Sequence, residues 1–392
     1  MMARALLFRS IAGLVSSTIY LILVVEAARR FRARSVKHVL PGASLPPVTV
    51  LKPLHGLEPR LERNLESFFL QDYPEFEIFF GARHANDPAL KIVNRLRNRY
   101  PHIKSRIVLS GEPVYPNAKV FSLEKMVGCA TASYLVITDS DVSVSSDCLR
   151  QVVAPLLDPG NGVVTCLYRG VAAGGFWSKL EALGMSIEMS SGVLVANMLE
   201  GMKFALGPTM ATRKDVLDSI GGITALGQYC ADDYVLGNLA YASGKRVVLS
   251  HHMIDHVAMN TSVRTSLGHQ VRWMRSTRFS RGAGHLGAGL TYAMPFGFLG
   301  LIAGAAGQNW RLGAGLLGFA LLNRVMQAIV VGWHLIGDSE SLRLCWLYPL
   351  RDLMGFFVWC ASFMGSEIVW RDERYRLMAH GKMVRVLTSR TE

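Results

Sequence analysis

The stretch YLVITDSD, residues Tyr134 to Asp141, places two carboxylates directly after an apolar run. The run predicts a buried strand over Leu135–Thr138, and Asp139 is the first residue after it. Two carboxylates two residues apart at a strand end, Asp139 and Asp141, can lie near one divalent cation, Mg²⁺ or Mn²⁺, with diphosphate oxygens completing its shell. The cation would offset charge that develops on a departing nucleoside diphosphate. A polar turn is the alternative interpretation of the same residues.

On both sides of this stretch, short β-rich runs alternate with helical patterns between about Pro47 and Ser280. The alternation predicts an α/β domain with right-handed βαβ units and a mostly parallel sheet that is covered on both faces. Ligands bind such sheets beyond the carboxyl ends of the strands, and Asp87 and Asp139 both follow a predicted strand. The other predicted strands are Val48–Lys52, Phe76–Gly81, Arg106–Leu109, Gly162–Cys166 and Arg246–Leu249.

Two further acids, Asp232 and Asp233, precede a helical stretch. One of them can cap the helix, while the other can remove a proton from an acceptor hydroxyl. We expect Asp233 to be this base and Asp232 to support it. Two capping acids are the alternative.

The motif HQVRW, His269 to Trp273, lies in a basic stretch. Arg272 can hold phosphate through two hydrogen bonds, and Trp273 offers a flat wall for an acceptor or a sugar. Nearby arginines are expected to lie on a solvated helix beside the membrane. They are Arg275, Arg278 and Arg281.

Two weaker candidates lie closer to the N-terminus. Asp87, in Asn86-Asp-Pro88, can accept a hydrogen bond from a nucleotide base or ribose, although an ordinary turn explains it equally well. Lys119 can bring a cation near the diphosphate, although a single lysine is more often only solvated. Both gain support from the motifs that follow them.

The chain of 392 residues carries a net charge of +13, and 50% of its residues are hydrophobic. No nucleic-acid motif is present, and the basic residues cluster beside apolar segments. This pattern favours attraction to lipid headgroups over binding of nucleic acid. The six cysteines form no CxxC pair, which predicts reduced thiols rather than a disulfide framework or a metal site.

An apolar stretch over residues 5–28 predicts an uncleaved membrane anchor. The positive-inside rule then places the domain over residues 47–281 in the cytoplasm, because only Arg4 and Arg9 precede the apolar core. The cations that follow it are Arg29, Arg30, Arg32, Arg34 and Lys37.

Further membrane segments are expected over residues 282–370, before a basic tail over residues 371–392. One segment, for which residues 282–310 are a candidate, can be re-entrant or interfacial, so the number of crossings stays open. Charged residues interrupt the later segments at Arg324 and at Arg351-Asp352. Because charge facing lipid is costly, these side chains should face protein or water.

Taken together, the chain resembles the ceramide glucosyltransferase family, in which bacterial hopanoid-linked glycosyltransferases are related members. The resemblance runs from about Val48 to Leu377. It rests on LKPLHGLEPRLERNLESFFLQDYPEFEI from Leu51, RKDVLDSIGG from Arg213, QYCADDY from Gln228 and WRDERYRL from Trp370. It implies a nucleotide-diphospho-sugar transferase fold of type A with membrane helices at both ends, a divalent cation, and inverting transfer from a UDP-sugar to a lipid hydroxyl.

The resemblance also implies roles for single residues. It assigns Asp87 to nucleotide binding, Asp141 to the metal–diphosphate region and Asp233 to the catalytic base. Arg272 and Trp273 belong to the family's RW motif, but His269 stands where the family has Gln or Arg. The stretch Met185–Asn197 lacks the His-Pro of the animal enzymes, so the resemblance says least about the acceptor.

The leading prediction is transfer of a hexose, glucose, from a UDP-sugar to the hydroxyl of a membrane lipid such as ceramide. Transfer of an N-acetylhexosamine to a hopanoid is the alternative. A processive polysaccharide synthase shares the acids but usually needs more membrane crossings. A sensor or transporter without activity would predict losses among the aspartate motifs, and all of them are intact. The oligomeric state does not follow from the sequence.

Overall fold

The computed structural model describes residues 1–33, 45–370 and 373–386. Of the residues discussed above, Arg34, Lys37 and parts of the basic tail lie outside these ranges. The chain divides into two compact units, each assembled from stretches that are separate in the sequence. The sheet unit comprises Ser35–Ala173, Glu200–Met259 and Val369–Glu392, and the helical unit comprises Met1–Arg34, Gly174–Leu199 and Asn260–Ile368.

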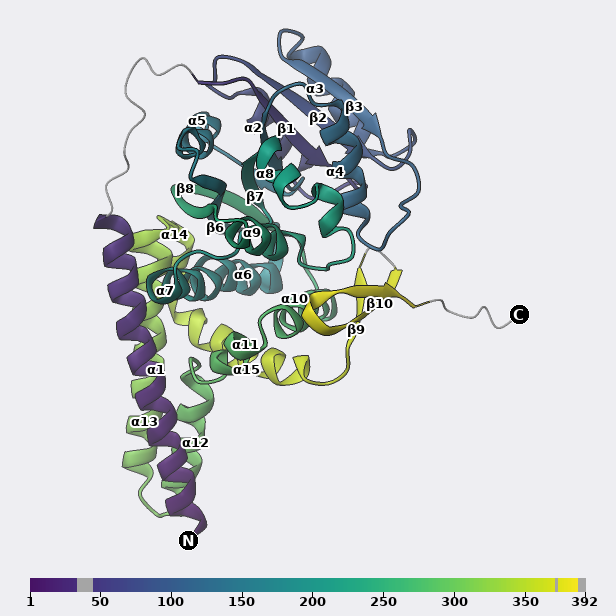
Figure 1. Ribbon diagram of the computed structural model, residues 1–392. Helices are drawn as coiled ribbons and strands as arrows, with labels where there is room; N and C mark the ends of the chain where they lie inside the picture. The colour runs from purple at the N-terminus through teal and green to yellow at the C-terminus, as the bar shows by residue number, and fades with distance from the viewer. Residues whose placement is uncertain (34–44, 371–372, 387–392) are drawn as a thin grey trace. The chain divides into compact units, whose positions relative to one another are not determined.

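An eight-stranded sheet is the centre of the sheet unit, in the order β3-β2-β1-β4-β7-β6-β8-β5 (Figure 1). Each predicted strand is present, and two of them, at residues 161–172 and 246–258, extend far beyond the predicted bounds. The strands are β1 (Val48–Pro53), β2 (Phe76–Ala82), β3 (Lys104–Leu109), β4 (Tyr134–Thr138), β5 (Val142–Ser143), β6 (Asn161–Ala172), β7 (Thr209–Arg213) and β8 (Arg246–Ala258).

The sheet is parallel on one side and mixed on the other. Strands β3, β2, β1 and β4 run parallel to one another, as the alternating pattern predicts. Strand β7, which we did not predict, lies antiparallel between β4 and β6. It places β4 in the interior of the sheet, where Leu135, Val136 and Ile137 are fully buried. The carboxyl end of β4, which carries Asp139, is therefore held on both sides.

Helices of the sheet unit fix the loops that follow the strands. Helix α4 packs on β1 and β2, while α5 and α9 pack on β6 and β8. The apolar face of α2 packs into the core, since Leu61, Leu65, Phe68 and Phe69 are all buried. The helices are α2 (Leu61–Phe69), α3 (Ala89–Arg99), α4 (Ala118–Cys129), α5 (Cys148–Val153), α8 (Lys214–Ser219) and α9 (Asp232–Ala242), with short turns η1 (Ala154–Leu157) and η3 (Ile223–Leu226).

A small second sheet lies near the C-terminus, in the order β11-β10-β9. Strands β10 (Glu373–Leu377) and β11 (Met383–Arg385) pair antiparallel, and a short turn η6 (Ala379–Gly381) joins them. Strand β9 (Glu367–Trp370) completes the sheet. The predicted basic tail therefore contains ordered strands.

The helical unit contains the membrane-like segments. Among the described residues, three helices are long and apolar enough to cross a bilayer: Met2–Ala33, Gly175–Glu200 and Trp310–Leu335. We did not expect the second of these. The elements are α1 (Met2–Ala33), α6 (Gly175–Leu183), η2 (Gly184–Met189), α7 (Ser190–Glu200), α10 (Val263–Ser280), α11 (Gly282–Ala288), α12 (Met294–Ala306), α13 (Trp310–Gln327), η4 (Ala328–Leu335), α14 (Ser339–Arg343), η5 (Cys345–Leu347) and α15 (Tyr348–Ser362).

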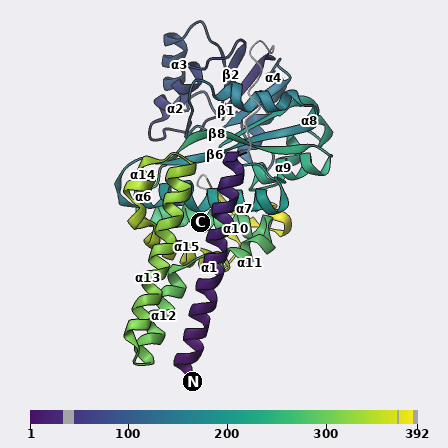
Figure 2. The same cartoon turned by 90° about the vertical axis from the view of Figure 1, so that its left-hand side faces the viewer.

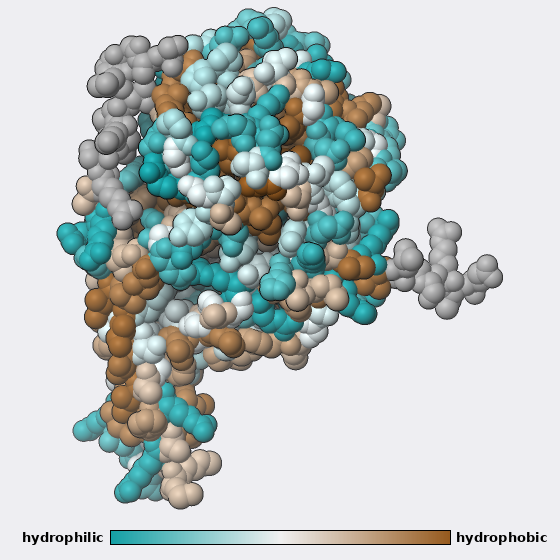
Figure 3. Space-filling model, viewed as in Figure 1, coloured by the Kyte–Doolittle hydropathy of each residue, from teal (hydrophilic) through white to brown (hydrophobic). Residues whose placement is uncertain are grey.

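Helices α1, α12 and α13 pack side by side (Figure 2). Close approach of α1 and α12 requires Gly13, because a Cβ there would lie 2.1 Å from the ring of Phe296. The surfaces of these helices are brown over much of their length in Figure 3, which marks apolar residues. Large apolar side chains are exposed there, as expected for contact with lipid. They include Phe8, Ile11, Val15, Ile19 and Ile22 on α1, Phe298 and Ile302 on α12, and Phe319, Leu321 and Leu322 on α13.

Arg324, Arg351 and Asp352 face protein, as predicted from the cost of exposing charge to lipid. Arg324 is 1% exposed, and its Nη1 lies 3.1 Å from Asp352 Oδ1. The other oxygen of Asp352 accepts hydrogen bonds from the amides of Ala293 and Met294 at the start of α12. Arg351 pairs with Glu188 at 2.8 Å. These pairs join helices that are distant in the sequence.

Candidate active site

Asp139 and Asp141 follow the end of β4, and neighbouring strands hold both residues. The Asp139 amide donates to Pro208 O, which precedes β7. Asp141 Oδ2 lies 3.1 Å from Nε2 of His256 on β8. The other oxygen, Asp141 Oδ1, is buried and has no hydrogen-bond partner. Burial opposes ionisation of Asp141, but His256 and neighbouring lysines hold its pKa below the usual range.

Lys119 connects two of the acidic motifs. It lies in the first turn of α4, after the N-cap Asn117, whose side chain accepts from the amide of Val120. Lys119 Nζ lies 2.7 Å from Asp139 Oδ1 and 3.6 Å from Asp232 Oδ2. Burial lowers the pKa of Lys119, but Asp139 and Asp232 raise it above the usual range. The lysine is buried and paired, so the solvated alternative is wrong.

Asp232 and Asp233 begin α9, but Ala231 occupies its N-cap position. Asp233 Oδ2 accepts from the amide of Gly207 at 2.6 Å, and Oδ1 accepts from the amide of Tyr234 at 2.8 Å. Residue 207 must be small, because a Cβ there would lie 2.9 Å from Asp233 Oδ2. Burial, with the neighbouring charge of Asp232, raises the pKa of Asp233 to about 6. Asp232 instead faces Lys119, so the two adjacent acids have different surroundings.

Asp87 joins two motifs that are separate in the sequence. Its carboxylate accepts from the amide of Gly56, at 3.2 Å to Oδ1 and 3.1 Å to Oδ2, and from the amide of Ala89 at the start of α3. Gly56 ends the LKPLHG motif with φ of 69°, a conformation that glycine adopts without strain. Asp87 therefore holds the loop after β1 in place.

The structure adds Lys52 and His256 to the residues predicted from the sequence. Lys52, inside LKPLHG, is fully buried, and its Nζ donates to Asp139 O at 2.7 Å and lies 3.8 Å from the ring centroid of Phe68. Burial lowers the pKa of Lys52 to about 7. A lysine at the end of an otherwise apolar strand was the available signal. His256 gave no comparable signal, because only the pairing of β8 brings it to Asp141.

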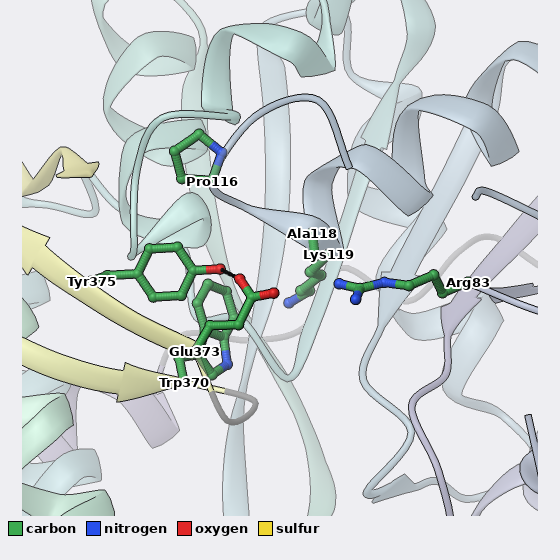
Figure 4. Close-up of a pocket in the computed structure, with 7 residues that line it drawn as sticks. All are labelled: Arg83, Pro116, Ala118, Lys119, Trp370, Glu373 and Tyr375. Atoms are coloured by element: carbon green, nitrogen blue, oxygen red, sulfur yellow. Dashed lines mark hydrogen bonds between the residues drawn. The ribbon is translucent and has the colours of Figure 1, made fainter. Parts of the chain in front are cut away.

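Two adjacent pockets open beside these residues in the sheet unit. One is lined by residues at the carboxyl ends of β1, β2 and β3, among them Pro53, Arg83 and Ser110. The other encloses about 240 Å³ open to solvent and is lined by Arg83, Pro116, Ala118, Lys119, Trp370, Glu373 and Tyr375 (Figure 4). Both are lined by Arg83 and Ala118, so the two pockets are neighbours. Its position agrees with the rule that ligands bind beyond the carboxyl ends of parallel strands.

His269, Arg272 and Trp273 lie on α10 in the helical unit. His269 Nδ1 lies 2.8 Å from Oε1 of Glu181, which is 2% exposed on α6, and the rings of His269 and Trp273 are 4.3 Å apart. Glu181 also accepts from Asn260 Nδ2 and Ser266 Oγ. The HQVRW motif is thus fixed to α6 through its histidine.

Two arginines that follow this motif differ from our expectation. Arg275 donates to the carbonyl oxygens of Met364 and Glu367, and Arg278 donates to that of Gly365 at 2.8 Å. They hold the segment after α15 rather than facing only solvent and lipid. Backbone carbonyl groups need hydrogen-bond donors, and these two arginines supply them to that segment.

The model of glycosyl transferase family 21 matches residues 9–383. The chain belongs to glycosyl transferase family 21. Ceramide glucosyltransferase 1 of Caenorhabditis elegans is 25% identical over 365 residues, which cover 88% of this chain and 74% of that protein. Ceramide glucosyltransferase of Komagataella phaffii is 36% identical over 135 residues, which cover 33% of this chain and 26% of that protein. The resemblance inferred from the motifs is confirmed.

One solved structure of another protein has a similar fold to this family 21 chain. The mannosyltransferase from Pyrobaculum calidifontis, in complex with GDP-Man and Mn²⁺, superposes with a TM-score of 0.53 at 17% identity, covering 92% of this chain and 99% of that chain. The predicted type A nucleotide-sugar transferase fold is therefore confirmed. The protein is a nucleotide-sugar glycosyltransferase that associates with membranes.

The residues of this family 21 enzyme fit a divalent cation. In the part of the chain that the structure describes, no group of three or more His, Cys, Asp or Glu side chains could hold a metal ion. A site completed by diphosphate oxygens and water needs only one or two carboxylates. Asp141 Oδ1, buried without a partner at the end of β4, is an oxygen of the required kind.

Proposed function

We propose that this protein transfers one hexose, glucose, from a UDP-sugar to the hydroxyl of a membrane lipid such as ceramide, with inversion in a single displacement. The observation that carries the proposal is the cluster in which Lys119 joins Asp139 to Asp232, beside Asp233. The apolar helices of the chain and the relatives named ceramide glucosyltransferase support a lipid acceptor.

Asp233 is the proposed base. Because its pKa is about 6, its carboxylate is ionised at neutral pH and is still basic enough to take the proton of a hydroxyl. The two backbone amides that it accepts from fix the direction of its oxygens. Asp232 supports it by holding Lys119.

Asp139, Asp141 and Lys119 are the proposed diphosphate site, with Mg²⁺ or Mn²⁺ held by Asp139 and Asp141. When bound, the cation neutralises charge on the diphosphate. Lys52 Nζ donates to the carbonyl oxygens of Asp139 and Val142 and so holds the backbone of the turn between them. Asp87 orients the loop after β1 at the pocket that we assign to the nucleoside.

His269, Arg272 and Trp273 are the proposed acceptor and diphosphate residues of the helical unit. Arginine binds phosphate oxygens through paired hydrogen bonds, and tryptophan offers an apolar face. The Glu181–His269 contact fixes the start of this motif. The excess of cations at the C-terminal end of the apolar segment in α1 supports a catalytic domain that faces the cytoplasm.

The test is an assay of the purified protein with labelled UDP-sugars and a panel of ceramide, diacylglycerol and hopanoid acceptors. We expect a single hexose on ceramide, with glucose preferred. A product with an N-acetylhexosamine on a hopanoid would replace both substrates in the proposal. A long polymer would show a processive synthase, and the absence of UDP binding would contradict the donor.

A further inference from the structure

The motif WRDERYRL, which begins at Trp370, has no part in the roles assigned so far. Its described residues enter the small C-terminal sheet, and β11 and the turn η6 before it are hydrogen-bonded to the segment 228–230. Met383 N donates to Gln228 O at 2.8 Å, and Cys230 N donates to Gly381 O at 3.1 Å. Tyr229 and Lys382 form an antiparallel bridge. We call Trp370 together with residues 373–385, which form β10, η6 and β11, the C-terminal hairpin.

The segment 228–230 leads directly into the acidic motif. Asn117 Nδ2 donates to Tyr229 O at 2.9 Å and to Asp232 Oδ1 at 3.4 Å. Asn117 is also the N-cap of α4, the helix that carries Lys119. The C-terminal hairpin is therefore connected to both sides of the Lys119–Asp232 contact through backbone and amide hydrogen bonds.

The C-terminal hairpin also supplies one wall of the pocket beside Lys119. Figure 4 shows Glu373 pointing toward Lys119 and Arg83 across the pocket, with Trp370 and Tyr375 beside it. The Glu373 carboxylate is fixed at both oxygens. Tyr375 OH donates to Oε2 at 2.5 Å, and Arg385 Nη2 donates to Oε1 at 2.9 Å.

The chemistry of this pocket matches a nucleoside diphosphate. Arg83 and Lys119 are cations suited to phosphate oxygens. A fixed carboxylate accepts hydrogen bonds from sugar hydroxyls, and an indole offers an apolar face. The neighbouring pocket, which shares Arg83, is lined by residues at the carboxyl ends of β1–β3, where a base can lie. In such a ligand the ribose lies between the base and the phosphates. With the base in the neighbouring pocket and the phosphates at Lys119, the ribose faces the wall that carries Glu373.

We propose that the C-terminal hairpin is part of the donor site, in which Glu373 accepts hydrogen bonds from the ribose hydroxyls of the nucleotide and Trp370 forms the apolar wall beside them. The inference rests on the proposed use of a UDP-sugar. It gives the WRDERYRL motif a direct role in donor binding, and it links donor binding to the acidic motif through the segment 228–230.

The test compares binding of UDP and of 2′,3′-dideoxy-UDP, each with Mn²⁺, to the purified full chain by calorimetry. The wild-type protein should bind UDP roughly tenfold more tightly than the dideoxy analogue, because a charged acceptor loses its hydroxyl partners. In Glu373→Gln this preference should fall to roughly twofold or less. A variant that merely loosens the fold weakens both ligands together and leaves the preference unchanged.

Val384→Ala is the matched control, because Val384 is 55% exposed on β11 of the same hairpin. It should keep the affinity and the preference, whereas Trp370→Ala should weaken both ligands by roughly fivefold or more, since stacked contact is lost. An unchanged preference in Glu373→Gln, or equal binding of both ligands by the wild-type protein, would overturn the inference and leave the proposed function standing. A wild-type protein that binds no UDP would overturn both.

Discussion

Asp232 and Asp233 are adjacent, yet their neighbours give them different chemistry. Asp232 lies 3.6 Å from the ammonium group of Lys119, so its charge is compensated. Asp233 accepts hydrogen bonds from backbone amides, and burial raises its pKa to about 6. Two adjacent acids with different surroundings can take separate roles, one structural and one as the base.

Replacement of Asp233 by Asn tests the base directly. The amide keeps the shape of the side chain but cannot accept the proton, so turnover should fall by about 10² to 10⁴ while UDP binding persists. Steady-state rates and UDP calorimetry on the same preparation measure the two effects. Full turnover in Asp233→Asn would remove this residue from the mechanism.

The pH dependence of kcat/KM follows from the same residue. A base must be deprotonated, so kcat/KM should rise by about tenfold per pH unit below about 6 and level off above it. Because the charge of Asp232 contributes to the raised pKa of Asp233, Asp232→Asn should move the midpoint to lower pH. A profile that is flat between pH 5 and 7 in the wild-type protein would be inconsistent with Asp233 as the base.

Asp141 offers a test of the cation site. Asp141→Asn replaces one charged oxygen, so Mn²⁺-dependent UDP affinity should fall by about tenfold or more, while the small affinity without metal changes little. Asp147→Asn is a suitable control, because Asp147 lies six residues further on and makes local hydrogen bonds with Ser145 and Gln151. Equal losses in both variants would argue against a cation at Asp141.

At the scale of elements, the sequence predicted what local patterns encode. Apolar runs located β1–β4, and the carboxylates at their ends located Asp87 and Asp139. Strand β7 (Thr209–Arg213) was missed because it forms through antiparallel pairing with β4 and β6. The local sequence pattern of these five residues does not indicate that pairing. The contacts of Lys119 with Asp139 and Asp232 were beyond prediction for the same reason.

The apolar helix Gly175–Glu200 was missed for a different reason. It carries Glu181 and Glu188, which interrupt its apolar pattern in the sequence. The structure pairs the first with His269 and the second with Arg351. Folding places a polar partner next to each of these carboxylates, which lowers the cost of a charged residue in an apolar helix. The sequence of the helix alone does not show that partner.

The hydrogen bonds of Glu181 predict that the packing of α10 on α6 contributes to stability. Glu181→Ala leaves the donors of His269, Asn260 and Ser266 without their acceptor, so the protein in detergent should lose about 1–3 kcal/mol of unfolding free energy. Glu181→Gln keeps an acceptor oxygen and should lose less. Lys179→Ala, on the exposed side of α6, should be neutral. Equal stability of all three variants would show that the contact does not hold α10.

At the scale of the whole molecule, both units are built from three separated stretches of chain. The chain leaves the sheet unit after Ala173, forms α6 to α7, and returns at Glu200. A division of the sequence into consecutive domains cannot express this order, and the predicted segment boundaries stay predictions. Long-range packing decides which stretch joins which unit, as the Arg351–Glu188 pair between two of these stretches illustrates.

This arrangement predicts how the protein is held in the membrane. Removal of residues 1–33 deletes one candidate span, but Trp310–Leu335 keeps an apolar surface with Phe319 and Leu322 exposed. A span of this length inserts without help from a second anchor. The shortened chain should therefore stay in the membrane pellet after an alkaline carbonate wash and enter solution only with detergent, as the full chain does. Release of the shortened chain by carbonate alone would show that α1 is the anchor and that Trp310–Leu335 does not insert.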